Sequence, residues 1–130
     1  MKDGVAINVH FNQLLKIYRQ LPWATKMTAD EFMVVLENSV VGLVTGTDGE
    51  EIVGFIRGIT DNKTVIYICD LWVAEGSRGM GIGKWLIGSV NKLMEETGVT
   101  AVVLTGEAKG FYQKHGFEER AGCMIRRANA

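Results

Sequence analysis

The sequence predicts one mixed α/β domain, in which helices flank a mostly antiparallel sheet that contains one parallel pair of strands. Three observations support this fold class. Apolar residues recur at helical spacing early in the chain, three β-type runs follow with short turns, and a strand, glycine-rich loop, helix and strand then form a crossover unit. With 130 residues, 47% of them apolar, we expect a single domain over residues 1–130.

Two amphipathic helices are predicted in the first third of the chain. Apolar side chains recur every three or four positions over residues 8–20, which predicts a helix that ends before Pro22. Thr28 is followed three positions later by Glu31, the pattern of a capping box. A second short helix should therefore begin after Thr28.

Three consecutive antiparallel strands follow these helices. The first two are predicted in VVGLVT and EIVGFIRGIT, which flank the hairpin-turn signal Asp48-Gly49. A further turn at DNK leads into the third strand, TVIYICDLWV. The alternation of these runs with short turns indicates a meander.

The second half contains the crossover unit and its continuation. Apolar positions on one face predict a helix from Ile82 to about Thr97, with Gly98 as its stop. The run TAVVLT suits a buried strand parallel to the third one, and EAKGFYQKHGF suits a short helix and turn. FEER and CMIRR are predicted as closing strands.

Composition excludes several classes of function. Lys and Arg total 14 against 15 Asp and Glu, so no basic footprint marks a nucleic-acid or anionic-membrane partner. No signal peptide and no uncharged apolar run near the roughly 20 residues of a membrane span are present, and we expect a cytoplasmic protein. Cys69 and Cys123 lack a CxxC pair and are expected to be buried, reduced thiols. His10 and His115 are isolated, so no metal site is predicted.

The stretch SRGMGIGKW places Arg78 before Gly79, Gly81 and Gly83 at the start of the predicted helix. A helix start carries unpaired N–H groups and partial positive charge, and glycines let an anion approach them. The alternative is a glycine turn that only permits close packing of the helix on the sheet. The glycines alone do not separate these two interpretations. Arg78, as a further phosphate ligand, favours the anion cradle.

Two common phosphate loops do not fit this stretch. A Walker loop requires a first glycine where Arg78 stands and a Ser or Thr where Trp85 stands. A dinucleotide fingerprint would need a third glycine at Lys84, and it follows a different strand arrangement. The anion is therefore of another kind.

The loop resembles the R-x-x-G-x-G pyrophosphate loop of the GNAT superfamily of acetyl-CoA-dependent N-acetyltransferases. DLWVAEGSRG resembles the family's fourth strand and its exit loop, and AKGFYQKHGF resembles its A-x-x-F-Y-x-K-x-G-F segment. The resemblance covers about residues 40–120, whereas residues 1–35 match only as two helices. Thr105 departs from the pattern, because many members carry Asn there.

The resemblance implies acetyl-CoA as cosubstrate, with no metal. The loop amides would hold its pyrophosphate, and backbone groups of Leu71 and Val73 would pair with its pantetheine arm where the parallel strands splay apart. The Val73 amide would also polarise the thioester carbonyl. The residues implied in cofactor binding are Leu71, Trp72, Val73, Arg78, Gly79, Met80, Gly81, Ile82, Gly83, Lys84 and Thr105.

Proton transfer requires a base and an acid. An amine with a pKa near 10.4 must lose a proton before it attacks, and Asp70 is the candidate base. The alternative is that Asp70 anchors a substrate ammonium or caps a turn. Tyr112 occupies the family's acid position, from which it would protonate the departing thiolate. The alternative for Tyr112 is a core aromatic packed on Phe111, but the match of the whole segment favours catalysis.

Four side chains are candidates for binding the acceptor. Trp23 and Trp72 would wall a site for an amine beside Asp70, since aromatic faces attract cations, or they simply pack. Arg57 would clamp a carboxylate of an amino-acid-like acceptor, or it is an exposed strand arginine. We expect the acceptor to be a small amine or amino acid.

Two rival functions remain open on the sequence. A non-catalytic acetyl-CoA sensor would not require Asp70 or Tyr112, so the presence of both favours an enzyme. A protein lysine or N-terminal acetyltransferase would need a groove open at both ends, and activity screens against peptides and small amines would separate it from the small-amine enzyme. A homodimer is compatible with the family resemblance, but no residue demonstrates one.

Overall fold

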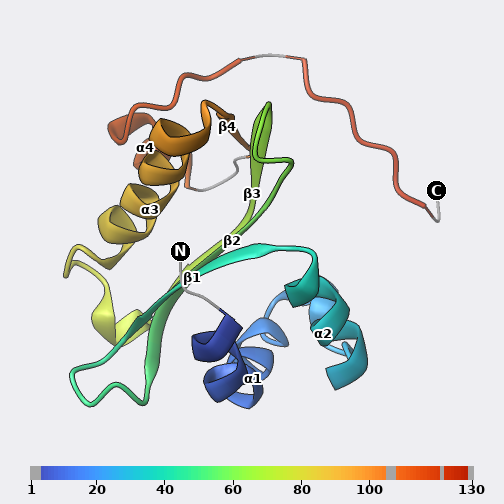
Figure 1. The fold of residues 1–130 in the computed structure, drawn as a ribbon, viewed down its shortest axis with the longest axis vertical. Coiled ribbons are helices and arrows are strands. Elements are labelled where there is room, and N and C mark those ends of the chain that lie inside the picture. The colour runs from blue at the N-terminus through green and yellow to red at the C-terminus, as the bar shows by residue number, and fades with distance from the viewer. Residues whose placement is uncertain (1–3, 105–107, 121, 129–130) are drawn as a thin grey trace.

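A four-stranded sheet in the order β1-β2-β3-β4 forms the centre of the computed structural model (Figure 1). The model describes residues 4–104, 108–120 and 122–128, with side chains from residue 10 onward. The strands are β1 (Val40–Thr45), β2 (Ile52–Thr60), β3 (Val65–Val73) and β4 (Thr100–Val103). β1, β2 and β3 pair antiparallel, and β4 pairs parallel with β3. The predicted mixed fold with one parallel pair is confirmed.

Helices cover both faces of this sheet (Figure 1). The helices are α1 (Gly4–Tyr18), α2 (Ala29–Glu37), α3 (Ile82–Thr97) and α4 (Lys109–Lys114). One apolar core joins α1 and α2 to β1 and β2 through residues such as Leu14, Phe32 and Phe55. The other joins α3 and α4 to the opposite face, around Ile56 and Leu86. The sheet is therefore the middle of three layers.

Local sequence signals account for most element boundaries. The Thr28 side chain accepts from the Glu31 amide and the Glu31 carboxylate accepts from the Thr28 amide, so the capping box is confirmed. Gly49 turns the β1–β2 hairpin at φ 74°, and Gly98 ends α3 at φ 79°. These positive φ values favour glycine over L side chains. α1 begins earlier than the predicted residue 8.

The second half of β3 lacks a neighbouring strand on its β4 side among the described residues. β4 pairs only with Val65–Ile68, whereas β3 continues to Val73. On the β2 side, Arg57 lies opposite Asp70 but Gly58 lies opposite Ile68, so Cys69 is the extra residue of a bulge. Among the described residues, the pairing of the two parallel strands thus ends at Ile68 and Val103, in the region where the family resemblance implies a splayed pair.

The predicted closing strands FEER and CMIRR are wrong. The arm, defined as residues 118–120 and 122–128, is irregular, and all of these residues are exposed. A strand forms only when a neighbour supplies hydrogen bonds, and in Figure 1 this segment runs away from the sheet. Cys123 is consequently exposed and Cys69 half-buried, so the prediction of two buried thiols is also wrong.

Candidate active site

The glycine loop between β3 and α3 needs left-handed backbone at two positions. Gly79 has φ 81° and Gly81 has φ 80°, and a Cβ built on either would meet no atom within 4 Å. L residues pay roughly 1–2 kcal/mol for this conformation. The two glycines therefore allow the backbone geometry, and the space beside them is open to a ligand.

Gly83 serves a different purpose in the same loop. A Cβ at Gly83 would lie 3.1 and 3.2 Å from two ring atoms of Phe111 in α4. Gly54 of β2 acts similarly, because its Cβ would lie 2.6 Å from Ile82 Cγ2. The glycines therefore act in two ways: Gly79 and Gly81 leave the backbone open, whereas Gly83 permits close packing of α3 on Phe111.

The first turn of α3 presents unpaired amides and positive charge. The first helical hydrogen bond joins the Trp85 amide to the Gly81 carbonyl at 3.0 Å, so the amides of residues 82–84 have no partner within the helix. The turn contains no acidic side chain, and Arg78 and Lys84 are exposed beside it. This end of α3 can therefore bind an anion through backbone groups and two cations.

A shallow groove of about 470 Å³ continues from this loop along the outer face of α3. It is lined by Gly81, Lys84, Trp85, Gly88, Ser89 and Lys92. The Trp85 side chain is 51% exposed, so one aromatic face and two ammonium groups are available on this surface. The sequence pattern missed this groove, because Trp85 matched the apolar face of the helix.

The second half of β3 pairs with β2 alone among the described strands, and its side chains point alternately to the two helical layers. Leu71 and Val73 pack against the α3 core, while Trp72 lies on the other face with its ring centroid 6.1 Å from that of Phe55. All three are half-buried. Their backbone lies next to the start of the loop that leads to α3, as the implied pantetheine contacts require.

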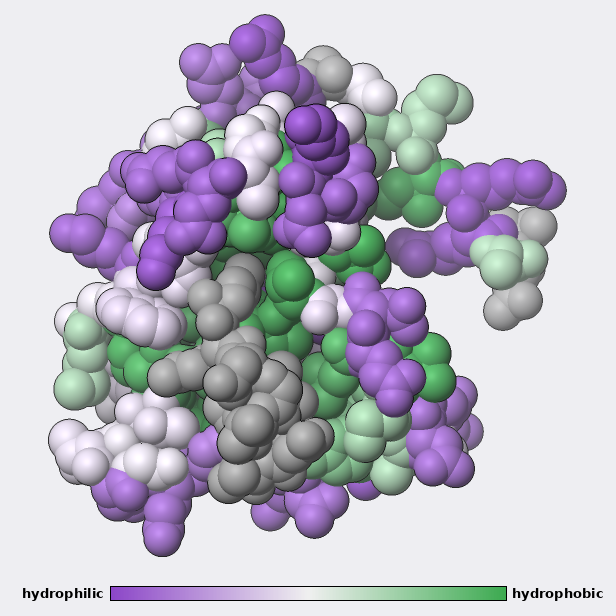
Figure 2. Space-filling view, in the orientation of Figure 1, coloured by the Kyte–Doolittle hydropathy of each residue, from purple (hydrophilic) through white to green (hydrophobic). Residues whose placement is uncertain are grey.

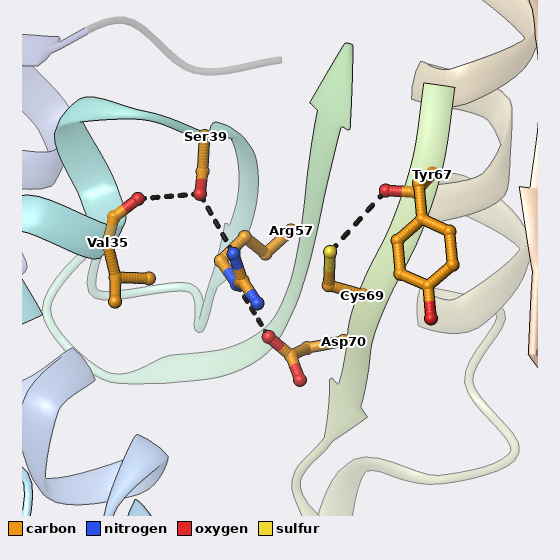
Figure 3. A network of polar contacts seen from close by, with 6 residues as sticks. All are labelled: Val35, Ser39, Arg57, Tyr67, Cys69 and Asp70. Carbon is orange, nitrogen blue, oxygen red and sulfur yellow. Dashed lines mark hydrogen bonds and ion pairs between the residues drawn. The ribbon is translucent and has the colours of Figure 1, made fainter. Parts of the chain in front are cut away.

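A buried ion pair occupies the α1–α2 side of the same strand region (Figure 3). Arg57 Nε donates to Asp70 Oδ2 at 2.6 Å, and Arg57 Nη1 donates to Ser39 Oγ at 3.0 Å. Ser39 Oγ in turn donates to the Val35 carbonyl at 2.6 Å. The side chains of Arg57 and Asp70 are only 14% and 5% exposed. The interpretation of Arg57 as an exposed strand arginine is therefore wrong.

Tyr18 completes this cluster and was not identified from the sequence. The Arg57 guanidinium lies 5.8 Å from the centroid of its ring. Burial and then the negative charge of Asp70 raise the pKa of the Tyr18 hydroxyl, while Arg57 and Trp23 act in the opposite direction. Tyr18 matched the apolar face of its helix, so periodicity classed it as core. The structure thus gathers Tyr18, Trp23, Arg57 and Asp70 in one region.

Electrostatics couple the members of this region. Burial disfavours the charged guanidinium, but the hydrogen bond to Asp70 and the charge of Asp70 outweigh it and raise the pKa of Arg57. Burial also raises the pKa of the Cys69 thiol at the bulge. The Arg57 guanidinium therefore stays charged, and the Cys69 thiol stays protonated at neutral pH.

Tyr112 lies in α4, on the other side of the strand opening. Its ring centroid is 5.3 Å from those of both Phe111 and Phe117, and the residue is buried. Burial, with a contribution from the charge of Asp70, raises the pKa of its hydroxyl above 10.0. Packing on Phe111 is therefore present, and the hydroxyl is also within electrostatic range of Asp70.

One further predicted residue lies at the edge of the cluster, and another is not among the described residues. Trp23 is the middle residue of the short 3-10 turn Pro22–Ala24 and is 68% exposed, so it borders the region without being buried in it. Thr105 lies outside the described residues. No group of three or more potential metal-ligating side chains occurs within the described part of the chain.

A family model described as the acetyltransferase (GNAT) family matches residues 9–117. The chain belongs to this family. The uncharacterized N-acetyltransferase ycf52 of Pyropia yezoensis is 25% identical over 115 residues, which cover 85% of this chain and 66% of that relative. This GNAT chain therefore spans somewhat less than two thirds of the length of the curated relatives it matches.

Solved structures share the fold of this GNAT domain. A Xanthomonas campestris pv. campestris protein described as belonging to the GNAT family has a TM-score of 0.80 at 23% identity, covering 98% of this chain and 91% of that one. AAC(6')-Iy in complex with the bisubstrate analogue CoA-S-monomethyl-acetylneamine has a TM-score of 0.68 at 18% identity, covering 91% and 90%. In the described ranges of this chain, no helix is long and apolar enough to cross a membrane.

Proposed function

We propose that this GNAT domain transfers the acetyl group of acetyl-CoA to a primary amine of a small molecule, with both substrates bound together. The observation that carries this proposal is the opening between β3 and β4. The bare start of α3 follows the loop after β3, and the contribution of the Asp70 charge to the raised pKa of Tyr112 supports a site that uses both groups. A thioester in this opening would lie between a group able to donate a proton and a carboxylate.

The cofactor would be held mainly by main-chain groups. The open space beside Gly79 and Gly81 fits a pyrophosphate on the amides of residues 80–84, with Arg78 and Lys84 beside it. The groove along α3 suits the 3′-phosphoadenosine end, since Trp85 offers a stacking face and Lys92 a second cation. Leu71 and Val73 offer unpaired strand backbone for the pantetheine arm.

The chemistry follows from the positions of three groups. Bound acetyl-CoA supplies a thioester carbonyl for attack by the amine. The amide of Val73 stabilises the oxygen that gains negative charge, and the Tyr112 hydroxyl donates its proton to the departing sulfur. A raised pKa suits this donor, because the phenol keeps its proton at neutral pH.

Asp70 receives or anchors the amine. Arg57 engages one carboxylate oxygen, and Figure 3 shows the other directed away from the guanidinium. That oxygen can hold an ammonium group or accept its proton. Because Arg57 already donates to Asp70 and Ser39, we assign it to positioning Asp70 rather than to clamping a substrate carboxylate. The exposed ring of Trp23 suits a cationic acceptor.

Calorimetry followed by an activity screen tests this function. The purified chain is titrated with acetyl-CoA and CoA, and thiol release is then measured across small amines, amino acids, amino sugars and peptides. Binding with release that depends on a small amine supports the proposal. Thiol release with peptides alone would indicate a protein acetyltransferase. Binding of acetyl-CoA without thiol release would indicate a sensor. If acetyl-CoA does not bind, the cofactor assignment is excluded.

The groove assignment has its own test. Lys92→Glu should weaken binding of CoA at least about tenfold, because it places a negative charge where the 3′-phosphate would lie, and should leave dephospho-CoA binding unchanged. Lys63→Glu, in the distant β2–β3 turn, is the matched control. Equal weakening of both ligands by Lys92→Glu would remove the 3′-phosphate from this groove.

A further inference from the structure

The Tyr18 hydroxyl lies in the acceptor region but takes no part in the proton transfers proposed above. Tyr18 is the last residue of α1 and is only 3% exposed. Its ring centroid lies 5.0 Å from that of Phe32 in α2 and 6.4 Å from that of Phe55 in β2, and the Arg57 guanidinium lies 5.8 Å from it. Contacts from two other elements therefore fix the direction in which this side chain points.

Two polar groups lie near the Tyr18 hydroxyl. Burial is the main cause of its raised pKa; Asp70 adds to it by its charge and as a hydrogen-bond acceptor, whereas the Trp23 indole N–H acts in the opposite direction as a donor. Tyr112 is subject to the charge of Asp70 without such a hydrogen bond. Of these two tyrosines, Tyr18 is therefore the nearer to the Asp70 carboxylate.

The Tyr18 hydroxyl oxygen is open to solvent although its ring is buried. The nearby carboxylate and indole do not make the short contact of a full hydrogen bond with it. Within the described part of the chain, every side-chain nitrogen or oxygen that is sealed from solvent has a hydrogen-bond partner. The Tyr18 oxygen, which has no such partner among the described residues, is therefore not sealed. An unpaired hydroxyl on a buried, fixed ring is available to a ligand.

The bonding capacity of this hydroxyl matches an amine. A phenol has one O–H donor and two lone pairs that accept hydrogen bonds. Asp70 can accept the O–H and the Trp23 indole can donate to one lone pair, so the second lone pair stays free for an N–H from a ligand. The Asp70 oxygen that Arg57 leaves free is also an acceptor. The region thus offers two neighbouring acceptors.

We propose that the Tyr18 hydroxyl binds the acceptor amine, accepting one of its N–H groups while the free oxygen of Asp70 accepts another. This inference rests on the proposed function, because it assigns the acceptor to this region. A neutral primary amine held in this way satisfies both acceptors and keeps its lone pair for attack on the thioester. An alcohol, or a secondary amine once neutral, has one hydrogen to donate and leaves one acceptor unpaired. Tyr18 is therefore a specificity-determining residue for primary amines.

Probes with apolar bodies suit this side of the molecule. Figure 2 shows apolar surface over α2, where Met33 and Val34 are exposed, and Trp23 in the preceding turn is also exposed. Butylamine and 2-phenylethylamine carry the same primary amine on two different apolar bodies. A contact made to the amine alone should contribute equally to the binding of both probes.

Amine binding is measured by NMR titration of the chain saturated with CoA, which carries no acetyl group to transfer. The dissociation constants of butylamine and 2-phenylethylamine should both rise about tenfold or more in Tyr18→Phe, because a hydrogen bond to the amine is lost. Tyr67→Phe removes a hydroxyl from the first half of β3 and is the matched control, with both constants unchanged.

Two further measurements separate this contact from a structural role of the hydroxyl. With acetyl-CoA, the ratio of kcat/KM for butylamine to that for N-methylbutylamine should fall at least about fivefold in Tyr18→Phe. The melting temperature of this variant should equal or exceed that of the wild type, because the hydroxyl has no full hydrogen bond among the described residues. A hydroxyl that served only the fold would lower the melting temperature and leave the ratio unchanged.

Four results would overturn the inference. These are a wild type that binds neither amine, wild-type affinity in Tyr18→Phe, an equal loss of affinity in Tyr67→Phe, and a lower melting temperature with an unchanged ratio. The proposed function can fail separately. Amine binding that depends on Tyr18 without thiol release from acetyl-CoA would refute acetyl transfer and leave this inference standing, whereas thiol release that Tyr18→Phe does not alter would do the reverse.

Discussion

The proposed cofactor side and the proposed acceptor side of this domain are built in opposite ways. The cofactor side is main chain: Gly79 and Gly81 hold a left-handed loop, exposed and continuous in sequence. The acceptor side is made of side chains, where Tyr18, Arg57 and Asp70 come from three different elements and are largely buried. A main-chain site depends on the absence of side chains at its glycines, whereas a side-chain site depends on charged groups that must remain paired.

This difference has energetic consequences for substitutions. Removing one partner of a buried ion pair leaves an uncompensated charge and lowers the free energy of unfolding. Adding a side chain to the open loop instead strains the backbone locally and blocks a ligand. Changes on the acceptor side should therefore reduce the stability of the fold, and changes at the open glycines should mainly reduce cofactor affinity.

Tyr112→Phe should have the largest effect, because Tyr112 is the proposed acid of the reaction. We expect kcat to fall about 100-fold or more, equivalent to at least about 2.7 kcal/mol in activation free energy, with acetyl-CoA affinity within about twofold of wild type. Steady-state kinetics and calorimetry measure the two quantities. Tyr67→Phe, in the first half of β3, is the control and should leave kcat unchanged.

The pH profile sharpens the same prediction. Burial and then the charge of Asp70 raise the pKa of Tyr112, so the hydroxyl retains its proton throughout the neutral range. Loss of activity from ionisation of Tyr112 should therefore begin at a higher pH in kcat than it would for an unperturbed tyrosine, and should vanish in Tyr112→Phe. An unchanged kcat in this variant would leave Tyr112 as a packing residue.

The next largest effect is expected in a double-mutant cycle on the buried Arg57–Asp70 pair. Arg57→Met and Asp70→Asn should each lower the free energy of unfolding by about 2–4 kcal/mol, and the double variant should lose less than the sum. Urea denaturation measures all three. Arg120→Met, which removes the exposed Arg120–Glu118 pair, is the control and should have no measurable effect. Additive losses would mean that the two groups are not coupled.

Gly81→Val tests the main-chain side. A β-branched side chain at φ 80° should weaken acetyl-CoA binding at least about tenfold and cost about 1–2 kcal/mol of stability. Gly76→Val, in the same loop but without positive φ, is the matched control for calorimetry and melting. Wild-type affinity in the folded Gly81→Val variant would contradict the anion cradle.

Gly83→Ala should have the smallest effect. The added methyl gains up to about 1 kcal/mol in helix propensity but lies 3.1 Å from the Phe111 ring, where overpacking costs about 1–3 kcal/mol. We expect a net loss of about 1 kcal/mol in stability and little change in cofactor affinity. Combining it with Phe111→Leu should recover stability. A large affinity loss without a stability change would mean that the cofactor, and not only Phe111, needs the space beside Gly83.

Local sequence patterns determined most of the elements and the backbone of the glycine loop. The capping box at Thr28, the turn at Gly49, the stop at Gly98 and the bare helix start after Gly81 depend on residues only a few positions apart. Helix propensity, capping and left-handed turns depend on residues this close in sequence, so these features can be predicted from the sequence alone.

Only the tertiary structure decided the acceptor side, the dual use of the glycines and the fate of the arm. The sequence of β2 is compatible with Arg57 as a substrate clamp or as an exposed residue, and only the fold shows that it pairs with Asp70. Gly83 makes room for Phe111, which belongs to another helix. The prediction of closing strands was wrong, because a strand's hydrogen bonds come from a neighbouring strand that its own sequence does not specify. Contacts between distant residues leave no periodic signal, and burial turns a charged side chain into a structural partner only once the chain has folded.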